Sequence, residues 1–216
     1  ESLRRLEKLT PELEAALRAA TAITTLEDLY APYRPKRRTR ATIAAERGLS
    51  PLADQLLEQP EGTTPPALAV PFINPEKGVE TADAALQGAA DILAERFSDD
   101  VRVREFTRTH YKKQGVMVSV KGRKAPEGPS DYQMYFEFKE PVSVIPAHRI
   151  LAINRGEKEG HLSTKVAVLP EPVLAHLSHL FLKHREYAAF FTPVFADSLD
   201  RLLGPSLERE IRSLLT

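Results

Sequence analysis

Leucine recurs at intervals of three or four positions through residues 3–17, and this spacing predicts an amphipathic helix at the start of the chain. Further along, Thr39 precedes a helical pattern that stops at Gly48, and Ser50 opens a second pattern. Two short helices joined by a Gly-Leu-Ser turn predict a helix-turn-helix-like unit over residues 39–58.

The middle of the chain combines a proline-rich connection with two longer helical patterns. Five prolines in residues 59–78 exclude one regular element there, and four apolar side chains are expected to anchor the segment. These anchors are Leu68, Val70, Phe72 and Ile73. Thr81 is expected to begin a long alanine-rich helix, and Asp99 or Asp100 to begin another that ends near Gly115.

Alternating apolar positions then predict two strands. Valine recurs at every second position at Val116, Val118 and Val120, and in residues 161–169 Leu162, Val166 and Val168 are apolar. The two strands, at 116–121 and 162–168, are expected to pair as a two-stranded element. Between the strands lie a loop, an aromatic cluster and one more helix. The cluster comprises Tyr132, Tyr135, Phe136 and Phe138, and the helix is expected to begin at Pro146 and end at Gly156 or Gly160.

Residues beyond Pro170 are expected to be helical throughout, with helices at 171–184, 186–191, 193–203 and 205–215. The predicted fold is therefore mainly α, a multi-helix domain that contains a helix-turn-helix and a small two-stranded β element. We expect two parts, an N-terminal helical region over residues 1–130 and a second helical region over residues 131–216.

The composition narrows the class of protein. The 216 residues include 30 basic and 30 acidic side chains, so any attraction to nucleic acid must come from local clusters. The absence of cysteine fits a reducing cytoplasm, where we expect this protein. No signal peptide, membrane helix or membrane partner is predicted, and the opening directly on a helical pattern is expected of a piece cut from a longer chain.

Several chemistries lack the residues that they need. The sequence contains no Gly-x-Gly, no Gly-Lys-Ser/Thr and no Gly-x-Ser-x-Gly, so nucleotide cradles and nucleophile elbows of these types are absent. His176 and His179 stand one helical turn apart, but no carboxylate at matching spacing completes a metal site. We therefore predict no catalytic residue, metal or cofactor, and rank a metal-dependent hydrolase far below a non-enzymatic protein.

Positive charge gathers in two segments of this neutral chain. Residues 34–47 hold six basic residues against one acidic residue, and residues 102–124 hold eight against one. Such clusters suit phosphate backbones, whereas the alternative is a solvated face or arginines paired with acids on neighbouring helices. The candidate nucleic-acid contacts in these segments are Arg34, Lys36, Arg37, Arg38, Arg40, Arg102, Arg104, Arg108, Lys112, Lys113, Arg123 and Lys124.

Four stretches in this order resemble the N-terminal region of the Tex family of bacterial transcription accessory proteins. They are residues 25–53, the alanine-rich helix, residues 131–160 and residues 202–215. The most specific is the run Pro-x-His-Arg-x-Leu-Ala-x-x-Arg-Gly-Glu-x-Glu-Gly at 146–160. The resemblance covers nearly the whole chain.

The resemblance implies a non-enzymatic, helical region that serves transcription through nucleic acid, RNA or DNA. Its further implied partners are RNA polymerase and other domains of the parent chain. In the family, the other domains of the parent chain are an RNase H-like domain, helix-hairpin-helix motifs and an OB-fold that carries most RNA affinity. The alternative function is a protein-interaction scaffold that packs on RNA polymerase or on those domains.

The family motif adds Arg149 and Arg155 to the candidate nucleic-acid contacts. One interpretation brings these arginines to a phosphate. The other pairs the arginines and glutamates of the motif so that they tie its helix to neighbouring elements, because one segment carries both signs of charge. The mixed charge favours the second interpretation.

Overall fold

The computed structural model describes residues 14, 18 and 38–215, and the chain divides into two compact units, Glu1–Thr39 and Arg40–Thr216. In the first unit, Glu14 and Arg18 are helical and form an ion pair at 2.8 Å. The rest of the leucine pattern at 3–17 lies outside the described residues, as do Arg34, Lys36 and Arg37.

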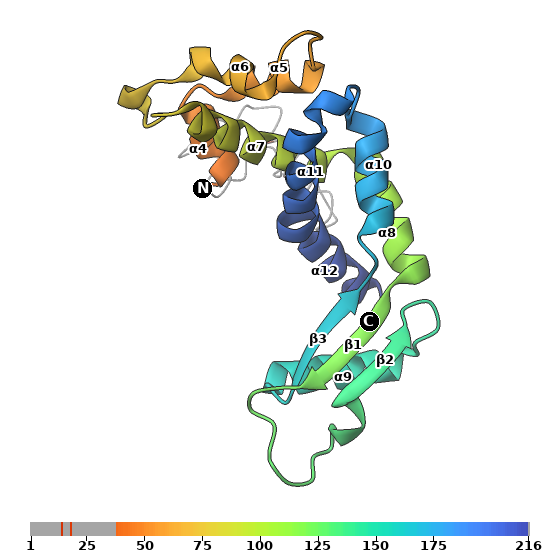
Figure 1. The fold of residues 1–216 in the computed structure, drawn as a ribbon. Helices are drawn as coiled ribbons and strands as arrows, with labels where there is room; N and C mark the ends of the chain where they lie inside the picture. Colours follow the sequence, from red (N-terminus) through yellow and green to blue (C-terminus); the bar gives the residue numbers. More distant parts are fainter. Residues whose placement is uncertain (1–13, 15–17, 19–37, 216) are drawn as a thin grey trace. The chain divides into compact units, whose positions relative to one another are not determined.

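The second unit begins with short helices packed against one long helix (Figure 1). These elements are α4 (Arg40–Glu46), α5 (Ser50–Glu58), α6 (Pro65–Ala69), the 3₁₀ turns η2 (Val70–Phe72) and η3 (Pro75–Lys77), and α7 (Ala82–Asp99). The predicted helices on either side of Gly48 are confirmed. The start of the long helix after Thr81 is also confirmed, since the Thr81 hydroxyl accepts a hydrogen bond from the Ala84 amide. Val70 and Ile73 do not anchor their segment, because both side chains are exposed.

The remaining helices run beside α7 and beyond it. They are α8 (Val101–Gln114), α10 (Glu171–Phe181), the 3₁₀ turn η5 (Arg185–Tyr187), α11 (Ala188–Asp197), the π-helical segment η6 (Ser198–Leu203) and α12 (Gly204–Leu214). Asp100 begins α8, as predicted, by accepting hydrogen bonds from the amides of Arg102 and Val103. The predicted helix break before Pro193 is wrong: Pro193 lies inside α11, where its buried neighbours Phe191 and Val194 hold the helix on the core.

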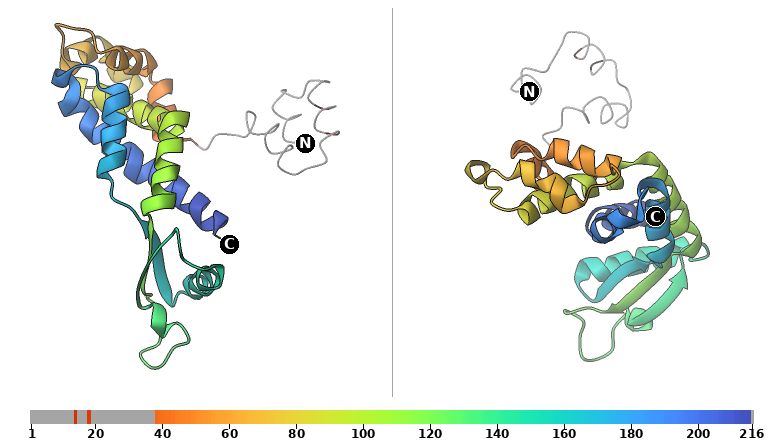
Figure 2. Two further views of the ribbon diagram at one scale, coloured as in Figure 1. Left: turned by 90° about the vertical axis from the view of Figure 1, so that its right-hand side faces the viewer. Right: turned by 45° about the horizontal axis from the view of Figure 1, so that its top comes forward.

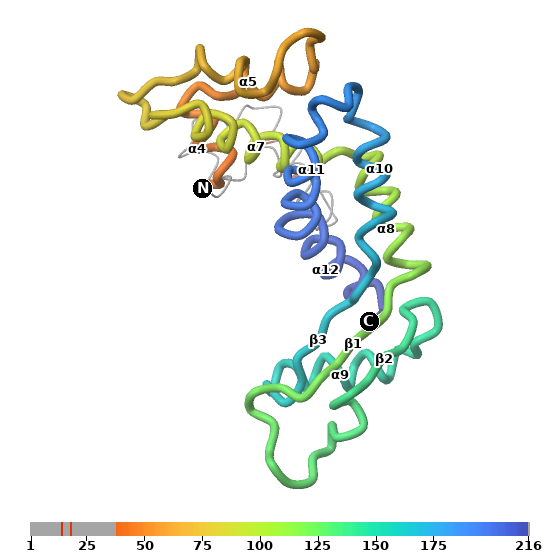
Figure 3. The backbone as a smooth tube through the Cα atoms, viewed as in Figure 1, coloured from red at the N-terminus to blue at the C-terminus, as the bar shows by residue number. Residues whose placement is uncertain are grey.

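A small antiparallel sheet begins directly after α8 (Figure 3). Its order is β2-β1-β3, with β1 at Val116–Lys121, β2 at Glu137–Pro141 after the 3₁₀ turn η4 (Gln133–Tyr135), and β3 at Leu162–Ala167. The predicted pairing of β1 with β3 is confirmed, and β2 is a third strand that the sequence pattern did not predict. Helix α9 (Ala147–Glu159) packs on the sheet and ends at Gly160, whose φ of 80° suits glycine.

Two hydrophobic clusters stabilise the unit. The first lies among the helices around Phe97, whose ring meets those of Phe181, Phe191 and Phe195. The second lies between α9 and the sheet. Leu207 of α12 belongs to the first cluster and Ile211, one turn later, to the second, so α12 joins the two. The division of the chain at residue 130 stays a prediction. Among the described residues, no helix combines the length and apolar character needed to cross a membrane.

Candidate nucleic-acid interface

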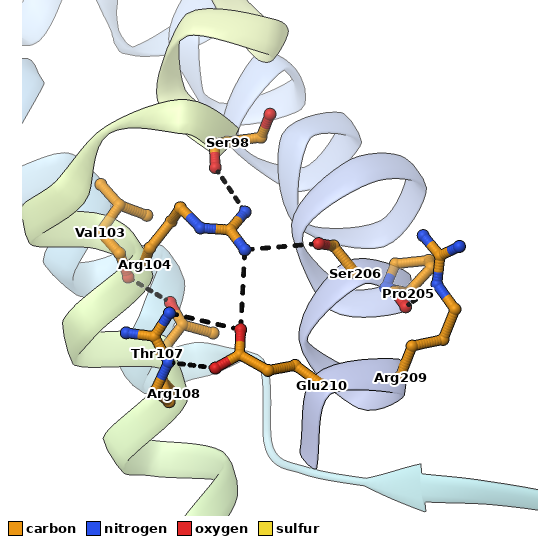
Figure 4. Close-up of polar contacts among 9 residues, drawn as sticks. All are labelled: Ser98, Val103, Arg104, Thr107, Arg108, Pro205, Ser206, Arg209 and Glu210. Atoms are coloured by element: carbon orange, nitrogen blue, oxygen red, sulfur yellow. Dashed lines mark hydrogen bonds and ion pairs between the residues drawn. The ribbon is translucent and has the colours of Figure 1, made fainter. Parts of the chain in front are cut away.

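Two of the candidate arginines on α8 are engaged by a carboxylate on α12. Glu210 accepts hydrogen bonds from Nε and Nη2 of Arg108, at 2.5 and 3.3 Å, and lies 3.7 Å from Nη2 of Arg104 (Figure 4). Arg104 also donates to the Ser98 carbonyl and the Ser206 hydroxyl. The hydrogen bond from Arg108 is the main cause that lowers the pKa of Glu210 below 4.5. These guanidinium groups therefore tie α8 to α12.

Arg102, at the start of α8, is held within its own turn. Its Nε and Nη2 donate to the two oxygens of Asp100 at 3.1 and 2.8 Å, and its guanidinium lies 5.5 Å from the centre of the Phe181 ring. Asp100 also caps the helix, so one carboxylate orders both the backbone and this arginine. A phosphate would have to compete with that carboxylate.

The family motif on α9 is tied to its neighbours by polar side chains. Nη1 of Arg149 donates to both oxygens of Glu140 on β2, at 2.8 and 2.7 Å. Glu157 and Asn154 accept hydrogen bonds from Arg212 of α12. For Arg149, the structure has the pairing that the mixed charge of the motif suggests.

Glu157 illustrates how this tie is stabilised. Burial by itself would raise the pKa of this carboxyl, but hydrogen bonds from Arg212 and Thr164 outweigh it and lower the pKa below 4.5. Glu208 of α12 adds a further tie, since it accepts a hydrogen bond from the Val166 amide on β3. Side chains of both signs thus fix α9, β3 and α12 to one another.

Other candidate cations are exposed. Lys112 and Lys113 lie in the last turn of α8, and Arg123 and Lys124 lie in the loop after β1. Among the described residues none of the four forms an ion pair, although Lys112 contributes to lowering the pKa of Glu210. That loop is fixed beside the end of α9, because the Lys124 amide donates to the Gly160 carbonyl at 3.0 Å.

The remaining candidates lie elsewhere. Arg155 is exposed on α9. Burial is the main cause that raises the pKa of the Tyr132 phenol, and the nearby charge of Arg155 opposes this rise. Arg38 and Arg40 are exposed, and Arg40, the first residue of α4, acts electrostatically on Asp197. The structure therefore places the candidate cations of this unit on separate elements, with Lys112 and Lys113 before β1, Arg123 and Lys124 after it, and Arg40 at the start of α4.

The histidines of α10 have a different environment from a metal site. The His176 ring stacks on Phe106, with 4.0 Å between ring centres and 11° between planes. Within the described ranges, no group of three or more His, Cys, Asp or Glu side chains is placed to hold a metal ion. The described structure thus gives no support to a metal-dependent hydrolase.

The sequence pattern did not predict which acids meet which arginines. Glu210 stands 102 positions from Arg108, and nothing in its local sequence distinguishes it from an exposed helical glutamate. The same holds for Glu140, whose strand was not predicted. Pairing across elements depends on their packing, which carries no local signal.

Comparison with known proteins decides the family. A family model described as "Tex central region-like" matches residues 60–194. This chain belongs to the Tex family. It is 43% identical to "Protein tex" of Bordetella pertussis over 85% of the chain, and 42% identical to "Transcriptional accessory protein Tex" of Neisseria gonorrhoeae over 76%. It is also 37% identical, over 97% of the chain, to "Uncharacterized protein YdcI" of Bacillus subtilis.

The matches cover a limited part of each relative. The chain spans 24% of the Bordetella Tex protein, 21% of the Neisseria protein and 30% of the Bacillus protein. The matched family model describes the central region of Tex, whereas the resemblance in sequence pointed to the N-terminal helical region.

Proposed function

We propose that this Tex-family chain is a non-enzymatic region that binds nucleic acid, RNA or DNA, in the service of transcription in the cytoplasm. The observation that carries the proposal is the state of the cations near the two ends of β1. Lys112, Lys113, Arg123 and Lys124 are exposed, and no carboxylate in the described part of the chain forms an ion pair with them. When exposed cations of this kind meet phosphates, the counterions condensed on the nucleic acid are released, which favours binding.

The ion pairs rank the candidate residues. Arg102, Arg104, Arg108 and Arg149 each meet a carboxylate, so a phosphate could engage them only by displacing that acid. We therefore propose that they contribute less than the four cations near the ends of β1. Arg155 has no ion pair among the described residues and is proposed with those four. The basic residues Arg34, Lys36, Arg37, Arg38 and Arg40 stay a predicted second contact, and a DNA-binding helix-turn-helix over residues 39–58 stays a prediction.

Binding of this kind should be salt-dependent and tolerant of sequence, because phosphates carry no sequence code. The test is fluorescence anisotropy with labelled single-stranded and duplex oligonucleotides over a series of salt concentrations. The variant Lys113→Glu with Lys124→Glu changes one cation near each end of β1. Its matched control, Lys77→Glu with Arg185→Glu, makes the same change in charge at exposed positions outside the proposed surface.

We expect the first variant to lose affinity by on the order of tenfold or more at low salt, while the control stays within about threefold of the unchanged chain. Equal losses in both variants would mean that only net charge matters. Absence of any binding at low salt would refute the proposal.

The second candidate function is a protein-interaction scaffold, and a groove between α7 and α11 favours it. The groove has a volume of about 500 Å³. Its lining is Asp83, Leu86, Gln87, Ala90, Ala189, Phe190, Pro193, Val194 and Asp197. RNA polymerase and the other domains of the parent chain are the proposed partners. Changing Phe190 to Glu should abolish binding of purified polymerase or of the parent's remaining domains, measured by calorimetry, and leave oligonucleotide binding unchanged.

A further inference from the structure

The face of the sheet that α9 does not cover has a defined set of side chains. Side chains alternate between the two faces of a strand. Met117 and Ser119 of β1 are fully buried on the side of α9, so Val116, Val118 and Val120 lie on the opposite face. In the left view of Figure 2, α9 lies on one side of the sheet, and no other helix of the described residues covers the opposite side. Val120 is accordingly 46% exposed.

The strand register places a lysine on either side of Val118. Val118 pairs with Lys139 on β2 and with Lys165 on β3. Residues directly opposite each other in an antiparallel ladder share a face, so both lysines lie on the open face beside the valines. With neighbouring strands about 4.8 Å apart, the backbones of the two lysines are separated by about 10 Å. Both are exposed, and neither forms an ion pair among the described residues.

This lysine pair lies between the cations of the proposed function. Lys113 precedes β1, whereas Arg123 and Lys124 follow it, and the six residues of the strand span about 20 Å. Lys139 and Lys165 stand beside the middle of that span. One acid shares the open face, because Glu137 pairs with Val120. Apolar side chains thus form a central stripe, with cations on both flanks and near both ends.

We propose that this open face seats a single-stranded nucleic acid; the inference rests on the proposed function and names its surface and ligand. Unpaired bases expose apolar faces, which the stripe of Val116, Val118 and Val120 can cover, while Lys139 and Lys165 meet the phosphates. A duplex hides its base faces by stacking, so it would leave the valines exposed. The face carries no aromatic side chain, because Phe138 pairs with Ser119 and lies on the α9 side, so the stacking on aromatic rings that strengthens many single-strand sites is absent.

The test compares a fluorescein-labelled 12-nucleotide oligothymidylate with a 12-base-pair duplex of mixed sequence. The variant Lys139→Gln with Lys165→Gln should lower affinity for the single strand on the order of tenfold and reduce the magnitude of its salt slope by about 1.4, or 0.7 per lost phosphate contact. The matched control, Lys77→Gln with Arg185→Gln, should change neither quantity by a comparable amount. Circular dichroism and thermal unfolding establish that each variant is folded.

A second variant examines the apolar stripe separately. Val118→Thr keeps the shape of the side chain and replaces a methyl by a hydroxyl, so it should weaken single-strand binding about threefold without changing the salt slope. Duplex binding should be unaffected by this change.

Two of the possible outcomes overturn the inference and leave the proposed function in place. If Lys139→Gln with Lys165→Gln binds like the unchanged chain while Lys113→Glu with Lys124→Glu does not bind, the open face is not the site and the proposed function stands. If duplex affinity falls as much as single-strand affinity, the choice of ligand is wrong. If the unchanged chain binds neither oligonucleotide, both proposals fail together.

Discussion

Glu210 of α12 holds the guanidinium of Arg108 on α8, although the two residues are 102 positions apart in sequence. The contact belongs to a wider pattern, because other polar residues of α12 meet β3 and α9. Together with Leu207 and Ile211, these contacts make α12 the element that joins the two hydrophobic clusters. Arginines that could bind a phosphate therefore stabilise contacts between elements of the fold.

The Arg108–Glu210 pair should contribute measurably to stability. Both side chains are about one third exposed, so solvent screening limits the coupling to about 1 kcal/mol. A double-mutant cycle with Arg108→Met and Glu210→Gln, measured by urea unfolding, gives this quantity. The control cycle uses Arg96 and Asp54, a more exposed pair, and should give a smaller value. Equal coupling energies in the two cycles would show that the α8–α12 pair has no special role.

Acid should destabilise the chain through Glu210 and Glu157. In the folded chain the pKa of both carboxyls lies below 4.5. For Glu210 the main cause is the hydrogen bond from Arg108. For Glu157 burial raises the pKa, but hydrogen bonds from Arg212 and Thr164 lower it by more. Groups with a lowered folded pKa stabilise the protein above their unfolded pKa, and this stabilisation is lost as pH falls through the folded pKa.

The free energy of unfolding should therefore fall as pH drops below about 5. The variant Glu157→Gln with Glu210→Gln should be less stable at pH 7 and should show a shallower decline towards low pH. Chemical denaturation between pH 7 and pH 3 measures both effects, with Glu127→Gln in the exposed loop as the control for loss of an exposed carboxylate. An unchanged pH profile in the double variant would contradict the assignment.

Gly156 should tolerate no larger side chain. A Cβ at this position would lie 2.7 Å from Cδ1 of Leu162 and 2.9 Å from the ring of Tyr132. Alanine favours helix over glycine, but the overpacking is expected to dominate, so Gly156→Ala should lower the free energy of unfolding by about 1–3 kcal/mol. Gly128→Ala is the control, because nothing lies within 4 Å of its added Cβ. Thermal unfolding that ranks Gly156→Ala as the more stable variant would show that the site can relax.

Phe97 should be the most sensitive position of the helical cluster. Its side chain is 1% exposed and its ring lies 4.4 Å from that of Phe181 and 5.3 Å from that of Phe195. Phe97→Ala should therefore lower the free energy of unfolding by about 3–5 kcal/mol, and Phe97→Leu by less, because leucine refills part of the space. Urea unfolding of the two variants measures the difference. A cost near zero for alanine would mean that the cluster collapses around the cavity.

Local sequence determined the elements whose signals lie within a few residues. Thr81 and Asp100 cap α7 and α8 through amides two or three positions away, so side-chain type and helical period sufficed. The alternating valines of β1 predicted a strand, and its pairing with β3 is confirmed, but the buried side chains of that strand are Met117 and Ser119 and not the valines. The run at 146–160 carried the family, which the comparisons confirm.

Only the tertiary structure decided that β2 is a strand, that α11 continues through Pro193, and which charged side chains meet. Strand β2 is an edge strand of sequence EFKEP without a buried residue, so no strong period marks it. Pro193 remains helical because Phe191 and Val194 are buried on the core, which outweighs the local preference for a break. Whether Arg108 meets Glu210, and whether Lys139 and Lys165 stand beside Val118, depends on packing and register between distant segments. A charge acts through space on whatever is near it, and the order of residues alone does not fix which groups those are.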